Sequence, residues 1–510
     1  MKREIPEPAV VKSVESKLDK PIANIELDAN FKGRVVGGGI ITVALQAIRF
    51  ILQFGSSIIL ARLLSPEDFG LFVMVIAFTG YLALFRDGGL SVATIQREEI
   101  NQQQISSLFW INVALGITLA LLVLCLAPAL VWFYQEPRLR GIAILISISF
   151  LITGMTVQPQ ALLRRQMRFG VLAVINTVSM ASGICVAIVL AAIGYQYWAL
   201  VWQIVITATV TAILVFSVQS WRPDKPYISK DSLPLLKFGG SLTISLALNQ
   251  IIQSIDQIVI GRLMGSSPLG LYAQARKLLV LPSQLVATSI TGVAVPSLSR
   301  AISNEPTFRR LFLNAVGITA SVSMPPIAFM IMYPEDLLVF LFGDQWRESS
   351  PFVRILGIGY YLTAVHSAPG WLCIATDSVK KQLHWSLIST PLFVIGIVVG
   401  GLYSARGIAI AFTTGWTVAY YALAFMACRN SPISFYAFIS CLVRSSLPSV
   451  IAGIITFSLF GTRCVSTSEL ATSCAVFGIL TILFMLLFPS QRNRLFLIGN
   501  TVASKVRQRA

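Results

Sequence analysis

The chain has 510 residues, of which 55% are hydrophobic and 12% are charged. A soluble protein carries about 25% charged residues, so this composition excludes an ordinary soluble domain. The formal net charge of +17 would favour nucleic-acid binding in a soluble chain, but here the basic residues gather in alternate loops, as in membrane proteins. The seven cysteines are scattered without metal-ligand spacing, so we expect no metal and no cofactor.

In chain order, residues 1–34 mix seven basic with six acidic residues and lack the apolar core of a signal peptide, which predicts a cytoplasmic tail. The apolar stretches that follow are too long and continuous for barrel strands, so we expect an all-α polytopic protein with about 14 transmembrane helices. The predicted spans are 35–62, 67–92, 105–133, 139–160, 169–194, 197–220, 237–263, 269–298, 308–333, 351–376, 379–402, 405–428, 442–460 and 469–488.

The turn between the first two spans returns later in the chain. Residues Ile58–Phe72 read IILARLLSPEDFGLF, and Ile258–Tyr272 read IVIGRLMGSSPLGLY, 200 residues later without a gap. Arg62 and Arg262 occupy equivalent places. This echo favours two related six-helix bundles over chance similarity. The predicted regions are a tail (1–34), a first lobe (35–220), a linker (221–236), a second lobe (237–428), two additional helices (429–488) and a basic tail (489–510).

The distribution of lysine and arginine predicts the orientation. With the N-terminus inside, 28 of the 39 basic residues fall in inner regions, eight fall in outer regions and three lie within spans. We therefore expect both termini in the cytoplasm. An even number of spans per lobe then gives the two lobes the same orientation, related by a pseudo-twofold axis along the membrane normal. The outer loop after residue 333 is expected to be short, and no loop outside the membrane is expected to be long enough to fold as a domain.

Polar residues form a stripe on the first span. Gln46, Arg49, Gln53 and Ser56 are spaced i, i+3, i+7 and i+10, which puts them on one helix face. A polar stripe inside a membrane either lines a cavity or holds helices together, and the intramembrane charge favours a cavity. Arg49 has no acidic residue at i±3 or i±4, so an anionic ligand is its expected partner.

A second stripe occupies the equivalent places of the seventh span. It comprises Asn249, Gln253 and Asp256, and Asp256 is the acidic residue that sits well inside a span. We expect it to take part in coupling or gating. In the eighth span, Arg276 and Lys277 either bind an anionic ligand or extend to the interface. The candidate substrate-binding residues are therefore Gln46, Arg49, Gln53, Asn249, Gln253, Arg276 and Lys277.

Two further polar features have plainer interpretations. Arg86 and Asp87, at the inner end of the second span, are expected to satisfy each other as an ion pair. His366 stands alone in an apolar stretch and is expected to pack in the core, with a proton-relay role as the alternative. The chain has neither a phosphate-binding glycine loop nor an extramembrane cluster of carboxylates and histidine, so we expect no catalytic residues and no enzyme activity.

The stretch RLLSPEDFGLF, followed by DGGLSVATIQR at Asp87–Arg97, resembles the Wzx-type polysaccharide flippases of the MOP exporter superfamily, particularly the colanic-acid exporters. That resemblance implies two MATE-like six-helix lobes around a central cavity that opens alternately to each side. The implied substrate is an undecaprenyl-pyrophosphate-linked oligosaccharide, flipped across the bacterial inner membrane. The implied partners are this lipid-linked substrate, membrane lipids, H⁺ or Na⁺, and the polysaccharide polymerase and chain-length machinery, with no nucleic acid.

Two alternatives share parts of this pattern. A MATE-like exporter of small molecules would have the same fold but would need ion-coupling carboxylates, of which Asp256 is the one candidate in the sequence. A membrane-bound glycan polymerase or ligase would require a catalytic cluster in a sizeable loop.

Overall fold

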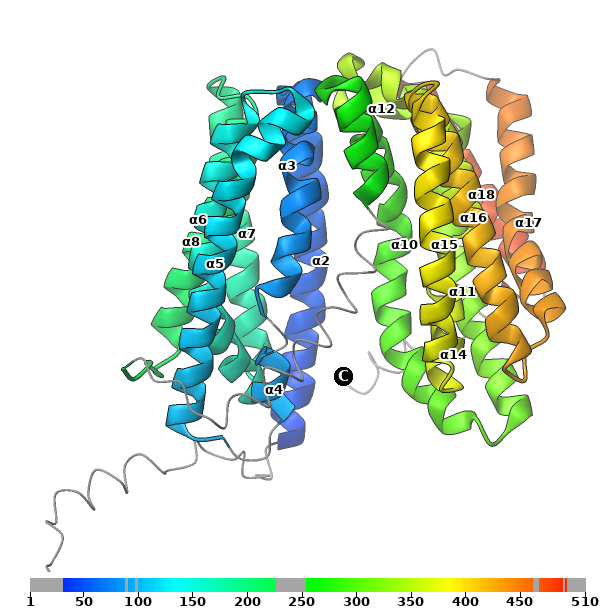
Figure 1. Cartoon of the computed structure of the whole chain (residues 1–510). Coiled ribbons are helices and arrows are strands. Elements are labelled where there is room, and N and C mark those ends of the chain that lie inside the picture. Colours follow the sequence, from blue (N-terminus) through cyan, green and yellow to red (C-terminus); the bar gives the residue numbers. More distant parts are fainter. Residues whose placement is uncertain are drawn as a thin grey trace, which may run out of the picture. The chain divides into compact units, whose positions relative to one another are not determined.

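The computed structural model describes residues 31–87, 90–96, 100–225, 254–461, 467–488 and 491–492. The described residues form helices and connecting turns without a β-strand, which confirms the predicted all-α class. The chain divides into two compact units, Met1–Ser254 and Ile255–Ala510. Each unit is a bundle of helices (Figure 1). The finer boundaries of the predicted lobes, linker and tails stay predictions.

The first unit is built mainly from long helices packed side by side. Its strongest packing is between α5 and α6 and between α7 and α8, and α2 packs against α7. The four helices α5 to α8 match the predicted spans within five residues at each end. The helices of this unit are α2 (Phe31–Leu63), α3 (Pro66–Phe85), α4 (Leu90–Gln96), α5 (Gln102–Tyr134), α6 (Leu139–Arg165), α7 (Phe169–Ala192) and α8 (Trp198–Val218).

The second unit begins with a helix over residues 254–264 and continues through a larger set of helices. Its core packs aliphatic side chains around the aromatic residues Phe308, Phe312, Trp371, Tyr420 and Phe438. The helices are α10 (Ser266–Ala301), α11 (Glu305–Met332), α12 (Pro334–Phe342), the 3₁₀-helix η2 (Asp344–Ser349), α13 (Ser350–Leu362), α14 (Ala368–Ala375), α15 (Val379–Gly401), α16 (Ala405–Arg429), α17 (Phe435–Phe460) and α18 (Thr467–Leu487).

Ten of the described helices are long and apolar enough to cross a membrane. Large apolar side chains stay exposed along several of them, as with Leu121 on α5 and Leu392 on α15. Such exposure is expected of surfaces that face lipid. The chain is therefore a multi-pass membrane protein, while the count of fourteen spans stays a prediction.

Three stretches differ from the predicted spans and loops. The second span is divided into α3 and α4, and the tenth is divided into α13 and α14. Pro369 lies in the first turn of α14, where proline fits because its missing N–H has no partner within the helix there. The stretch predicted as a short outer loop is helical and forms α12 and η2. Pro334 starts α12 because proline fits the first turn of a helix.

Both copies of the repeated turn join two helices, but the second helix is capped differently in each copy. In the first copy, Ser65 accepts a hydrogen bond from the Asp68 N–H and donates its own N–H to the Asp68 carboxylate, which is a reciprocal cap for α3. In the second copy, Gly265 precedes α10 with φ of 86°, a conformation that favours glycine. The turn is retained although its capping chemistry has changed.

Close helix packing in the first unit depends on small residues. A Cβ atom on Gly116 of α5 would lie 2.9 Å from the carbonyl oxygen of Phe150 on α6. A Cβ atom on Gly183 of α7 would lie 2.8 Å from the carbonyl oxygen of Gln203 on α8. Small residues at such crossings let helix backbones approach in a membrane, where no hydrophobic force drives the helices together.

Candidate functional site

The polar stripe on α2 is present as a helix face. Arg49 is half-buried and donates to the Oε1 atom of Gln46, whereas Gln46 and Gln53 are exposed. Ser56 is buried and donates to the carbonyl oxygen of Gln53 at 3.0 Å. The Nε atom of Arg49 is buried and has no acceptor among the described residues. A guanidinium with unused donors can accept an anionic ligand.

Two members of the predicted second stripe, Asn249 and Gln253, lie outside the described residues. The third, Asp256, is fully buried in the helix over residues 254–264. Its carboxylate accepts hydrogen bonds from the Tyr272 hydroxyl at 2.6 Å and from Nη1 of Arg276 at 2.7 and 2.9 Å. The carboxylate therefore has a cationic partner from α10 in its own unit.

Arg276 joins this carboxylate to two further helices. Its Nε atom donates to the Tyr360 hydroxyl of α13 at 3.2 Å, and its guanidinium carbon lies 4.9 Å from the ring centre of Phe412 on α16. Buried ion pairs need such additional partners because both charges lose their hydration. The cluster formed by Asp256, Tyr272, Arg276, Tyr360 and Phe412 is called the carboxylate–arginine cluster below.

Lys277 and His366, two other titratable residues singled out in the second lobe, are not part of the carboxylate–arginine cluster. Lys277 is exposed, whereas its neighbour Arg276 is partly buried and pairs with Asp256. His366, expected in the core, is exposed in the turn between α13 and α14. The break in the tenth span, which the sequence interpretation missed, removes the helix that would have carried His366 into the interior.

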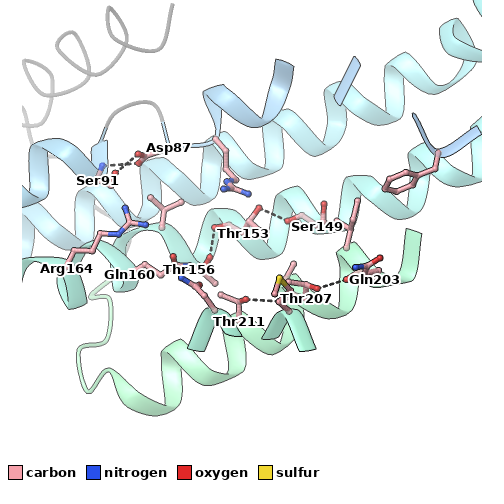
Figure 2. A pocket seen from close by; sticks show the side chains of 17 residues that line it. Asp87, Ser91, Ser149, Thr153, Thr156, Gln160, Arg164, Gln203, Thr207 and Thr211 are labelled. Carbon is pink, nitrogen blue, oxygen red and sulfur yellow. Dashed lines mark hydrogen bonds between the residues drawn. The ribbon is translucent and has the colours of Figure 1, made fainter. Parts of the chain in front are cut away.

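A polar cavity of about 740 Å³ lies within the first unit (Figure 2). Five helices contribute to it. The side chains come from α3 (Phe72 near its start) and its C-cap (Arg86), the α3–α4 turn and α4 (Asp87, Ser91), α6 (Ser149, Thr153, Thr156, Val157, Gln160, Arg164), α7 (Asn176, Met180) and α8 (Gln203, Ile204, Thr207, Ala208, Thr211).

The hydroxyl groups of this cavity donate to the helices that carry them. Thr153 donates to the carbonyl oxygen of Ser149 at 2.6 Å, and Thr207 and Thr211 each donate one turn back at 2.7 Å, as the dashed lines in Figure 2 show. These bonds use the hydroxyl hydrogens and leave oxygen lone pairs for a ligand or water. The cavity wall can therefore accept hydrogen bonds at several depths.

The charged residues of the cavity are not paired as the sequence interpretation expected. Asp87 accepts from the Ser91 N–H at 2.9 Å and from the Ser91 hydroxyl, and not from Arg86. The guanidinium groups of Arg86 and Arg164 donate no hydrogen bond to a described residue, and neither forms an ion pair within the described part of the chain. Arg86 is half-buried and Arg164 is exposed.

The sequence does contain a pattern that indicates this cavity, a polar stripe on α6 like the one on α2. On α6, Ser149, Thr153, Thr156, Gln160 and Arg164 are spaced i, i+4, i+7, i+11 and i+15, so they share one face. Serine and threonine are common in membrane helices because they can satisfy themselves on the backbone. The arginine and glutamine at the end of the face distinguish it from such self-satisfied positions.

Comparison with known proteins places the chain in a family. The family of polysaccharide biosynthesis proteins matches residues 59–351, which is more than half of the chain. The chain belongs to this family. Its similarity to the lipopolysaccharide biosynthesis protein WzxC of Escherichia coli is 24% identity over 69% of this chain and 73% of the relative. It is also similar to the teichuronic acid biosynthesis protein TuaB of Bacillus subtilis, with 24% identity over 82% of this chain and 89% of the relative.

A third relative is the succinoglycan biosynthesis transport protein ExoT of Rhizobium meliloti, which is 27% identical over 61% of this chain and 63% of the relative. These relatives confirm the predicted resemblance to polysaccharide-export proteins.

Solved structures give the fold. The lipid II flippase MurJ in an inward closed conformation matches 88% of this chain and 98% of its own, with a TM-score of 0.69 and 14% identity. An inward-facing MATE multidrug resistance transporter of the MOP superfamily matches 80% of this chain and 98% of its own, with a TM-score of 0.58 and 16% identity. The predicted MATE-like helical architecture is confirmed.

Proposed function

We propose that this protein is a flippase that moves undecaprenyl-pyrophosphate-linked oligosaccharides across the bacterial inner membrane by alternating access, for polysaccharide export. The observation that carries the proposal is membership of the polysaccharide biosynthesis family in a chain with ten membrane-length helices. The relative ExoT is named a transport protein, and the structural relative MurJ is named a lipid II flippase. Both termini lie in the cytoplasm in this proposal.

The substrate sets a physical requirement that Arg49 fits. A pyrophosphate headgroup must pass a hydrocarbon layer about 30 Å thick, where an unpaired anion is very costly. Arg49 lies about 27 Å along α2 from Phe31, at 1.5 Å per residue, and its Nε donor is unused. Guanidinium matches phosphate oxygens well. Arg49 binds the pyrophosphate in this proposal, with Gln46 and Gln53 beside it.

The remaining candidate residues bind the headgroup at other points along its route across the membrane or act in gating. Asn249 and Gln253, at the sequence positions equivalent to Arg49 and Gln53, bind the same headgroup in this proposal, and Arg276 and Lys277 receive it nearer the outer side. Asp256 acts in gating, because Arg276 becomes available for the headgroup when the carboxylate no longer holds it. Association with the polymerase and chain-length machinery remains part of the proposal.

Reconstitution tests the function directly. Purified protein in liposomes that contain a lipid-linked oligosaccharide should carry the glycan between leaflets, measured by its accessibility to a glycan-cleaving enzyme added outside. Arg49→Ala should lose about tenfold or more of the rate, since a charged hydrogen bond contributes about 1.5–3 kcal/mol. Arg49→Lys should keep part of it. Arg140→Ala removes an exposed arginine at the start of α6 and serves as the control.

Normal transport by Arg49→Ala would show that Arg49 only joins helices. Failure of the unmodified protein to move any lipid-linked glycan would contradict the function itself. In that case export of a small molecule, coupled to an ion gradient, is the second candidate, since the MATE fold is shared. A fluorescent dye extrusion assay in the same liposomes measures it.

A further inference from the structure

The cavity in the first unit is more than a packing defect. Its 740 Å³ would hold about 25 water molecules at about 30 Å³ each, and it lies within the range of about 300–1,000 Å³ that is typical of small-molecule sites. The wall carries hydroxyl and amide groups from α6, α7 and α8. Water or a hydroxyl-rich ligand can form hydrogen bonds with the amides, whereas a lipid chain would leave the amides without partners.

Charge narrows the choice of ligand. Arg86 and Arg164 contribute two positive charges to the cavity, and Asp87 contributes one negative charge whose oxygens accept from Ser91. The excess charge is positive. Charged residues in membrane segments are costly and usually mark a substrate path, and two like charges in one cavity are best stabilised by an anion. Carboxylate and phosphate groups match the planar donor geometry of guanidinium.

The size and wall of the cavity indicate more than a small ion. The Gln160, Asn176 and Gln203 side chains are amides, which can both donate and accept hydrogen bonds, and none of them has a partner among the described residues. Figure 2 shows Gln160 with Arg164 at one end of the cavity and Gln203 toward the other. Phe72 adds one apolar face. Amides, hydroxyl oxygens and one aromatic ring suit a sugar, whose hydroxyl groups alternate with apolar C–H faces.

We infer that the cavity of the first unit binds an anionic saccharide, a sugar unit that carries a carboxylate or phosphate group. Arg86 and Arg164 hold the anionic group, and the amides of Gln160, Asn176 and Gln203 hold the sugar hydroxyls. The inference rests on the proposed function, because the glycan of a lipid-linked substrate supplies such a unit. It makes the cavity a glycan subsite that is separate from the pyrophosphate residue Arg49 on α2.

Binding of free sugars tests the site without transport. Purified full-length protein in nanodiscs is titrated with glucuronate, glucose and inorganic phosphate, with binding followed by saturation-transfer NMR. Glucuronate should bind, and Arg86→Gln and Arg164→Gln should each weaken it by about tenfold or more, while Arg164→Lys should retain part of the affinity. Arg168→Gln is the matched control, because Arg168 is exposed four residues further along and does not line the cavity.

Three results would overturn the inference. The variants could bind glucuronate as the unmodified protein does, glucose could bind as tightly as glucuronate, or inorganic phosphate could displace glucuronate at equal concentration. Size-exclusion profiles and melting temperatures of the variants verify that they are folded. If Arg86→Gln and Arg164→Gln both fail to fold, the charge-preserving Arg164→Lys and the dependence of glucuronate binding on its carboxylate, compared with glucose, decide the outcome.

Transport separates this inference from the proposed function. In liposomes, Arg164→Gln should slow a lipid-linked glycan containing a uronic acid by about tenfold and leave a neutral glycan unaffected. Equal slowing of both glycans would contradict the subsite. If the unmodified protein moved neither glycan but still bound glucuronate through Arg86 and Arg164, the proposed function would fail and the site would stand.

Discussion

At the scale of single residues, the pairing of Asp256 with Arg276 changes what either residue can do. The sequence predicted that both residues lie inside spans. Asp256 is 16 residues from Tyr272 and 20 from Arg276, and these separations alone do not indicate that the side chains are in contact. The turn at Gly265 provides the missing information, because nine residues before it and eleven after it reach similar depths on antiparallel helices. Sequence reasoning identified these two residues, and it missed that they are partners because it treated each helix separately.

The carboxylate–arginine cluster predicts how paired variants behave. Asp256→Ala leaves a buried guanidinium without its counter-charge and should cost about 3–5 kcal/mol of stability. Arg276→Met should be similarly harmful, whereas the double variant Asp256→Ala/Arg276→Met should recover part of the loss, as expected of coupled residues. Thermal unfolding of the purified proteins measures this. Additive losses would show that the two residues are not coupled.

Gating by Asp256 makes a separate prediction. Asp256→Asn keeps the size of the side chain but removes the negative charge that holds Arg276, so the flipping rate should change by about tenfold or more. Asp224→Asn, in the segment after α8, is the control and should keep the rate of the unmodified protein. An unchanged flipping rate in Asp256→Asn would leave the carboxylate with a structural role alone.

At the scale of helices, Gly183 positions part of the wall of the cavity. The Cβ atom of any other residue would approach the Gln203 carbonyl oxygen at 2.8 Å and would overlap Thr207, and both of these residues line the cavity. Gly183→Val should therefore push α8 away from α7, weaken glucuronate binding and lower the melting temperature. Gly478→Val on α18 is the control, because a Cβ there meets nothing within 4 Å. Unchanged binding in Gly183→Val would show that α8 does not shape the site.

The helices themselves were the part of the fold most accessible from the sequence. Lipid requires long apolar runs to satisfy their backbone internally, so α5 to α8 could be located from composition alone. The breaks were harder to locate, because the interruption at Thr363–Ser367 is only five residues long and Pro369 follows it inside α14 rather than within the break. The cavity was missed because its wall is distributed over five helices, and a stripe on one helix reveals only one side of such a site.

At the scale of the whole molecule, the described contacts of the first unit agree with the alternation of loops that the charge count predicts. At one end, Gln102 donates to the Arg222 carbonyl oxygen and Trp110 to that of Asp224, which joins the start of α5 to the basic segment after α8. At the other, Glu67 pairs with Arg138 at 2.5 Å, and Asp68 accepts from the Tyr197 N–H at 3.0 Å. Segments predicted on the same side of the membrane therefore contact each other.

Cysteine labelling can assign these two ends to the two sides of the membrane. In a cysteine-free background, Pro137→Cys and Tyr195→Cys should react with a membrane-impermeant maleimide in intact spheroplasts, because both positions are exposed at the end that the charge count places outside. Gln166→Cys and Lys225→Cys, at the basic end, should react only after permeabilisation. The reverse pattern would invert the membrane orientation. The two arginines of the cavity lie at the basic end, so they would then face the leaflet where the glycan is released instead of the leaflet where it is assembled. The saccharide would in that case bind after translocation rather than before it.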